Sequence, residues 1–88
     1  METDEEGDEI LEIAAEISPL LHGHEPGVQG AVLADLVSRW VANHFHEEGG
    51  ELSRKIRREV LADFVKLVRG LVPFHVEAVN EFKKRREN

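Results

Sequence analysis

Two His-x-His pairs are the residues of this sequence whose type and spacing best suit chemistry. His22 with His24, and His44 with His46, place four imidazoles in two short segments. Neutral imidazole is the commonest metal ligand in proteins, so each pair is a candidate metal site. If the second pair lies on a helix, its two side chains point about 200° apart and cannot both reach one ion.

The spacing of these pairs along the chain argues further against one shared metal site. They flank a predicted helix of about 20 residues, which would separate them by about 30 Å within one chain, so only an antiparallel dimer could bring them together. His44 and Glu48 could supply two ligands if the helix extended that far, but the motifs Glu-x-x-His and His-Glu-x-x-His are absent. We expect no metal or cofactor, with metal binding by His22, His24, His44 or His46 as the alternative function. The lone His75 is expected at a helix end or on the surface.

Two groups of basic residues raise the question of nucleic-acid binding, namely Arg54, Lys55, Arg57 and Arg58, and the run 83–86. A helix, a Gly-Gly turn and a second helix that opens with bases are superficially similar to a helix-turn-helix reader. However, Glu47, Glu48 and Glu51 lie beside these bases, the net charge is −7, and no aromatic residues alternate with the bases. Nucleic-acid binding is therefore our third hypothesis.

The sequence offers little to an enzyme. Ser18, Ser38 and Ser53 lack the glycine-framed context of a nucleophile, and the chain has no Cys, no Tyr and no glycine-rich phosphate loop. We predict that the protein is not an enzyme.

The element that dominates the sequence is a predicted central helix over 27–46. Its apolar residues spread over roughly 220° of the helix surface, well beyond an ordinary amphipathic stripe. One neighbouring helix cannot cover so wide a face, and leaving it in water is unfavourable. We expect this helix to pack against both neighbours and to share its remaining face with a second copy.

The other predicted helices span 9–22, 52–70 and 74–86. Pro19 is expected to interrupt the first, and Pro73 to end or kink the third, because proline lacks an N–H and clashes with the preceding turn. Residues 1–8 form an acidic, flexible lead-in, and 83–88 a basic tail. Arg57 falls on the apolar side of its helix, and we expect its guanidinium to reach an acid on the first helix.

Composition places the chain in one class. With 88 residues, 41% hydrophobic and 33% charged, it is expected to form a single all-α domain over 1–88, a bundle of three to four helices. Disulfides are excluded because cysteine is absent, and neither a secretory signal nor a run of about 20 apolar residues is present. These features favour a soluble, cytoplasmic protein without membrane contact.

Charge is divided unevenly along the chain. Residues 1–51 carry 13 acids against Arg39 alone, whereas 52–88 carry 5 acids against 10 bases. Opposite charges favour encounter and register in an antiparallel bundle or between two subunits. We predict a homodimer that acts as a non-catalytic interaction or regulatory module, with an unknown protein as a possible further partner. The expected interface residues are Leu33, Leu36, Val37, Trp40, Val41, Phe45, Phe64 and Val68.

Overall fold

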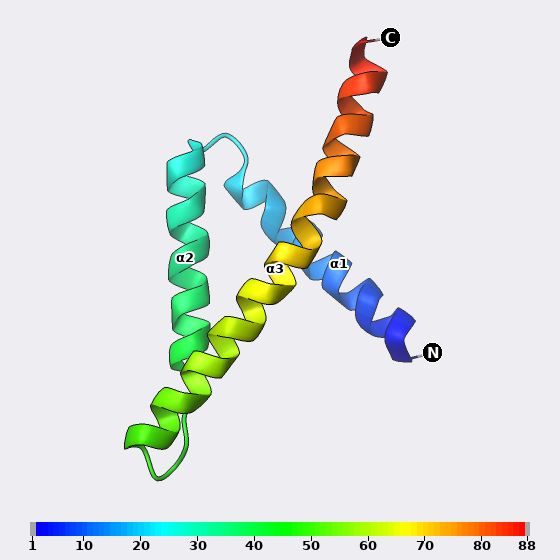
Figure 1. Cartoon of the computed structure of the whole chain (residues 1–88). Coiled ribbons are helices and arrows are strands. Elements are labelled where there is room, and N and C mark those ends of the chain that lie inside the picture. The colour runs from blue at the N-terminus through cyan, green and yellow to red at the C-terminus, as the bar shows by residue number, and fades with distance from the viewer. Residues whose placement is uncertain (1, 88) are drawn as a thin grey trace. The chain divides into compact units, whose positions relative to one another are not determined.

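The computed structural model describes the backbone of residues 2–87 and the side chains of residues 5–87. It contains three helices in this range and no strand, as Figure 1 shows: α1 (Glu2–Leu21), α2 (Pro26–Ala42) and α3 (Gly50–Glu87). The all-helical prediction is confirmed. The chain divides into two units, Met1–Leu36 and Val37–Asn88, with the boundary inside α2.

Helix α1 begins earlier than the sequence indicated and continues through Pro19. It starts at Glu2 rather than at residue 9, so the predicted lead-in is helical from that residue. Negative side chains near a helix N-terminus are favourable because they face the positive end of the helix dipole. The predicted interruption at Pro19 is also wrong, because α1 continues to Leu21. The His22 amide then donates to the Pro19 carbonyl over 3.2 Å and closes the last turn.

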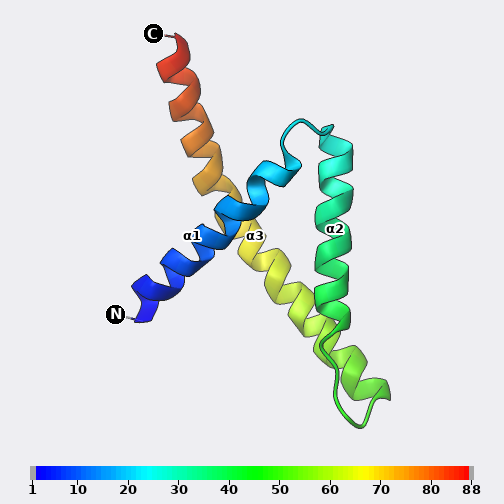
Figure 2. The same ribbon diagram turned by 180° about the vertical axis from the view of Figure 1, so that it is seen from behind.

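In the first unit, a short loop joins α1 to α2, as the cyan segment of Figure 2 shows. Gly23 has a φ of 83°, a conformation that glycine adopts without strain. The side-chain amide of Gln29 donates to the Leu21 carbonyl (2.7 Å) and to the His24 carbonyl (3.0 Å). Gln29 thereby binds both the end of α1 and the loop, and it fixes the turn within this unit.

Helix α2 ends at Ala42, four residues before the predicted end at residue 46. The amides of Asn43 and His44 still donate to the Arg39 and Val41 carbonyls, over 3.1 and 3.0 Å, and the chain then leaves the helix. Phe45 therefore lies in a loop. The sequence had indicated that it belongs to the apolar face of the helix, and this prediction is wrong.

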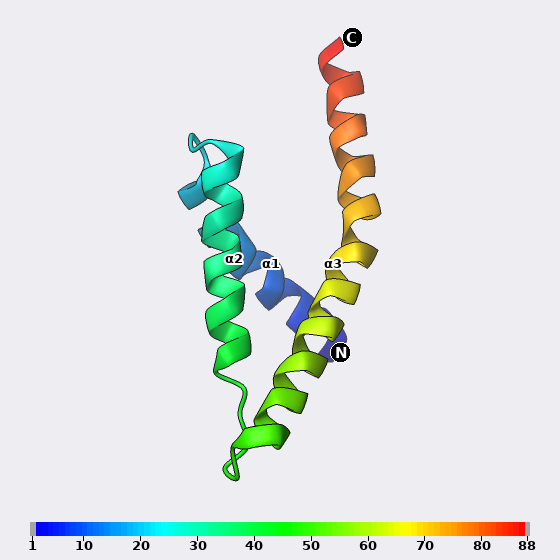
Figure 3. The same cartoon turned by 60° about the vertical axis from the view of Figure 1, so that its left-hand side comes forward.

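Helix α3 replaces the two helices that we predicted over 52–70 and 74–86. It runs unbroken from Gly50 to Glu87 and contains Pro73. Since proline has no N–H, the carbonyl four residues earlier loses its helical partner, which favours a bend. Figure 3 shows the axis changing direction between the yellow and orange parts of α3. Pro73 bends this helix and does not end it.

The described side chains form no buried hydrophobic core. Among residues 5–87 no hydrophobic residue is buried, and the only buried residue is Ser53, which is 6% exposed. The apolar faces of the helices are therefore in contact with solvent in the single chain.

No helix within 2–87 has both the length and the apolar character that crossing a bilayer requires.

Candidate interaction surfaces

The turn between α2 and α3 is the most connected part of the second unit, and Arg57 is at its centre. Its guanidinium donates to the Ala42 carbonyl (Nε 3.2 Å, Nη2 2.9 Å) and to the His44 carbonyl (Nε 3.0 Å). These partners are backbone carbonyls of the turn, and the expected contact with an acid on the first helix stays a prediction. A cation at a helix C-terminus satisfies carbonyls that have no partner within the helix, so Arg57 caps the end of α2.

Ser53 joins the same turn to α3. The His46 amide donates to the Ser53 hydroxyl over 3.1 Å, and that hydroxyl lies 3.4 Å from the His46 carbonyl. From the sequence Ser53 was considered only as a possible nucleophile. No local pattern marks its actual role, because the amide that it binds lies seven residues earlier, in the loop before α3.

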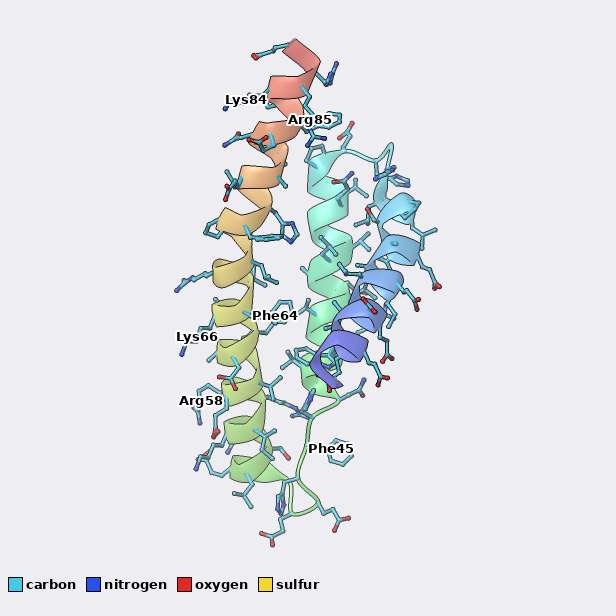
Figure 4. The ribbon with its side chains drawn as sticks, turned by 90° about the vertical axis from the view of Figure 1, so that its right-hand side faces the viewer. Phe45, Arg58, Phe64, Lys66, Lys84 and Arg85 are labelled. Atoms are coloured by element: carbon cyan, nitrogen blue, oxygen red, sulfur yellow. The ribbon has the colours of Figure 1, made fainter. Side chains whose placement is uncertain are left out.

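Trp40 packs against the first half of α3. Its ring centroid lies 5.6 Å from that of Phe64 and 5.0 Å from the imidazole of His44. Figure 4 shows Phe64 directed from α3 toward α2, whereas Phe45 extends from the loop. Two of the predicted interface residues, Trp40 and Phe64, thus contact each other within one chain.

The eight predicted interface residues belong to both units of the chain. Five are 40% to 65% exposed, namely Leu33, Leu36, Trp40, Phe45 and Val68, and the other three, Val37, Val41 and Phe64, are half-buried. Leu33 and Leu36 line a groove in the first unit, whereas Val68 lies on α3 in the second. Their role as one interface stays a prediction.

Both histidine pairs lie in loops rather than on helices. The helical argument against His44 and His46 therefore does not apply, because α2 ends before them. The Nδ1 of His44 lies 2.8 Å from the Trp40 carbonyl and must donate to it, whereas the Nδ1 of His46 accepts from the Glu48 amide over 3.1 Å. Within residues 2–87 no group of three or more His, Cys, Asp or Glu side chains lies close enough to hold a metal ion.

The basic residues of α3 have several different surroundings. Arg54 pairs with Glu51 over 3.0 Å, and Arg57 binds the carbonyls of the turn. Figure 4 shows Arg58 and Lys66 on the side of α3 away from α2. Arg86 lies 5.9 Å from the ring centroid of Phe82. These contacts stabilise the helix and its turn, and none of them indicates recognition of a base or a phosphate.

An apolar groove between α1 and α2 occupies the first unit. We call it the hairpin groove. Leu20 and Val28 are among the exposed hydrophobic residues on its two sides, so solvent reaches this groove. The complete lining is Ile17, Leu20, Leu21, His24, Val28, Gln29, Val32, Leu33 and Leu36.

A second apolar depression lies entirely on α3, and we call it the α3 patch. Its lining consists of Val68, Leu71, Val72, His75, Val76 and Val79. Because one helix supplies all six side chains, the depression is the space between neighbouring side chains on one helix face. The patch was not predicted, because two separate helices were expected on either side of Pro73, and its residues come from both of them.

Comparisons with known proteins place the chain in no family: no family model, no curated protein and no solved structure matches it.

Proposed function

We propose that this protein is a non-catalytic helical interaction module, and that it associates with a second copy of itself. The observation that carries the proposal is the exposure of the apolar helix faces. Twenty-two large hydrophobic side chains among residues 5–87 are at least 38% exposed in the single chain. Soluble monomers seldom leave contiguous apolar patches of this extent in water, and such patches mark sites of association.

The accessible surface supports the same proposal. The chain exposes 8091 Å² of accessible surface. A standard stable interface needs only about 800 Å² from each partner. The chain therefore has ample area for a dimer, and enough remains for a further protein partner.

The proposal assigns the module no reaction and no cofactor. It places the protein in the cytoplasm, because a chain without cysteine can keep its structure in a reducing compartment. The division of charge between residues 1–51 and 52–88 would aid the encounter of two copies at low ionic strength.

Sedimentation equilibrium at several concentrations tests the proposal. We expect a mass of twice 10.0 kDa that falls toward one chain on dilution. A single-chain mass at every concentration, together with cooperative thermal unfolding, would show that the apolar faces cover one another within one molecule. That result would overturn the proposal.

A further inference from the structure

The α3 patch has an internal symmetry that specifies its partner. Its six lining residues form three pairs whose numbers add to 147: Val68 with Val79, Leu71 with Val76, and Val72 with His75. If a second α3 lies antiparallel against the first with residue i opposite residue 147 − i, Val68 faces Val79 and Val72 faces His75 across the pair, while Leu71 and Val76 flank this line on its two sides. A surface that is complementary to itself in this way is what a two-fold symmetric dimer requires.

The same register continues beyond the patch. The residues Val65, Val68, Val72, His75, Val79 and Phe82 are spaced alternately by three and four, which is the heptad spacing of a coiled coil. In the antiparallel register Val65 lies opposite Phe82, and both are exposed in the single chain. The depression between the side chains of the patch corresponds to the hole that receives a side chain of the facing helix.

The residues that weaken the helix lie outside this contact line. On the heptad that places Val72 at position a, Gly70 falls at f and Pro73 at b. Both positions face away from the partner helix. A bend at Pro73 therefore does not remove an interface side chain.

Charge favours the antiparallel over the parallel orientation. The four consecutive bases at 83–86 would meet the same four bases of the partner in a parallel pair. In the antiparallel register they lie at the level of residues 61–64, which contain Asp63 and no base. The dipoles of the two helices also oppose each other in this orientation.

We propose that the second copy binds through the α3 patch, with the two α3 helices antiparallel and the two-fold axis between Val72 and His75. This inference rests on the proposed function, since it needs a homodimer. It adds the interface, the orientation and the register. Each copy contributes the same six side chains, and the hairpin groove remains available to another protein.

Cysteine pairing tests the register directly, because the chain has no cysteine of its own. Two single variants are made, Val68→Cys and Val79→Cys, one of them carrying a mass tag. In the antiparallel register residue 68 of one copy faces residue 79 of the other. Two copies of residue 68 are instead offset along the helix axis by 11 residues, or about 16 Å. Under mild oxidation we expect disulfide-linked dimers at least tenfold faster in the mixture than in either variant alone.

A matched control uses Leu67→Cys mixed with Asn80→Cys. These numbers also add to 147, but both residues face away from the partner on the same heptad. The control mixture should therefore not cross-link above the rate of its separate variants. A control that cross-links as fast as the mixture of Val68→Cys and Val79→Cys would show random collision and would overturn the register.

The remaining outcomes separate the two proposals. Sedimentation of the wild-type chain decides whether a dimer exists at all. If it does, rapid cross-linking of each variant alone would show a parallel pair, and no cross-linking of the Val68→Cys and Val79→Cys mixture would show that another segment, such as α1 of the partner, covers the patch. Either result overturns the inference about α3 while the homodimer stands. A monomeric wild-type chain overturns both.

Discussion

The two halves of α3 differ in what lies against them, although they belong to one continuous helix. In the first half, Ser53, Arg57 and Phe64 contact the turn or the end of α2. In the second half, every residue from Val65 to Glu87 is exposed in the single chain. Apolar residues are about equally frequent in 50–64 and in 65–87, so composition alone does not explain the difference. The first half has contacts within its own unit, whereas the second half exposes its apolar side chains in the single chain.

The sharpest way to break this comparison is a charge in the middle of the α3 patch. The change Val72→Asp places a carboxylate among the apolar side chains of the interface in both copies, where it loses water and where His75 is the only polar side chain of the patch. We expect the dimer dissociation constant to rise about 100-fold, measured by sedimentation equilibrium.

Leu67→Asp is the matched control for this charge. Leu67 is also exposed and apolar and lies on the same helix, but it is about 140° around the axis from Val72. Its dissociation constant should change by less than about threefold. Equal weakening by Val72→Asp and Leu67→Asp would show that the dimer does not use the predicted face.

Substitutions in the first half of α3 should change the stability of the fold rather than the dimer dissociation constant. The change Arg57→Ala leaves the Ala42 and His44 carbonyls without their guanidinium donor. Because Arg57 is only half-buried, water can replace part of this contact, and we expect a loss of about 1–2 kcal/mol in the free energy of unfolding. Urea unfolding at one fixed chain concentration, followed by Trp40 fluorescence, measures it.

Arg54→Ala provides the comparison for Arg57. Arg54 lies one turn earlier and pairs with Glu51, and both side chains are highly exposed. Such surface pairs contribute little, so the change should be below about 0.5 kcal/mol. If both variants lose the same amount, the turn is not the stabilising feature that the structure indicates.

These two halves also show how far the sequence could be interpreted. The helical class, the width of the apolar faces and the turn at Gly49 were accessible from spacing and composition. The continuity of α3 was not, because Pro73 is a strong local signal and the energy that keeps a helix intact across it comes from elsewhere along the helix. When two separate helices are predicted, Val68 and Val79 fall in different helices, so the heptad that joins them through Val72 is not recognised.

The role of Arg57 was hidden for a different reason. Its partners are backbone carbonyls, which every residue carries, so no side-chain pattern marks them. The end of α2 was also predicted too late, because side-chain spacing does not show where backbone hydrogen bonds stop. Phe45 continues the apolar spacing, although the hydrogen bonds of the helix end before it. Side-chain periodicity predicts faces better than it predicts the residues at which helices end.

A substitution at His75 should strengthen the dimer, whereas Val72→Asp should weaken it. His75 is the one polar residue among the six of the α3 patch, and in the proposed register it lies opposite Val72. A polar residue in a coiled-coil contact lowers stability, so His75→Leu should tighten the dimer about tenfold. Dilution series in the ultracentrifuge measure this change. His22→Leu, in the exposed α1–α2 loop, is the control and should leave the dissociation constant unchanged.

The smallest expected effect concerns Ser53, the one buried residue among those described. Ser53→Ala removes the acceptor of the His46 amide while keeping a similar volume. A single neutral hydrogen bond contributes about 0.5–1.5 kcal/mol, and Ser18→Ala on the exposed part of α1 should cost less. Trp40 fluorescence during urea unfolding reports on this turn, whereas the dimer dissociation constant should stay within about twofold of the wild type. A large change in the dimer dissociation constant of Ser53→Ala would contradict this expectation. It would mean that the two halves of α3 are coupled, because a change in the turn would then alter the α3 patch.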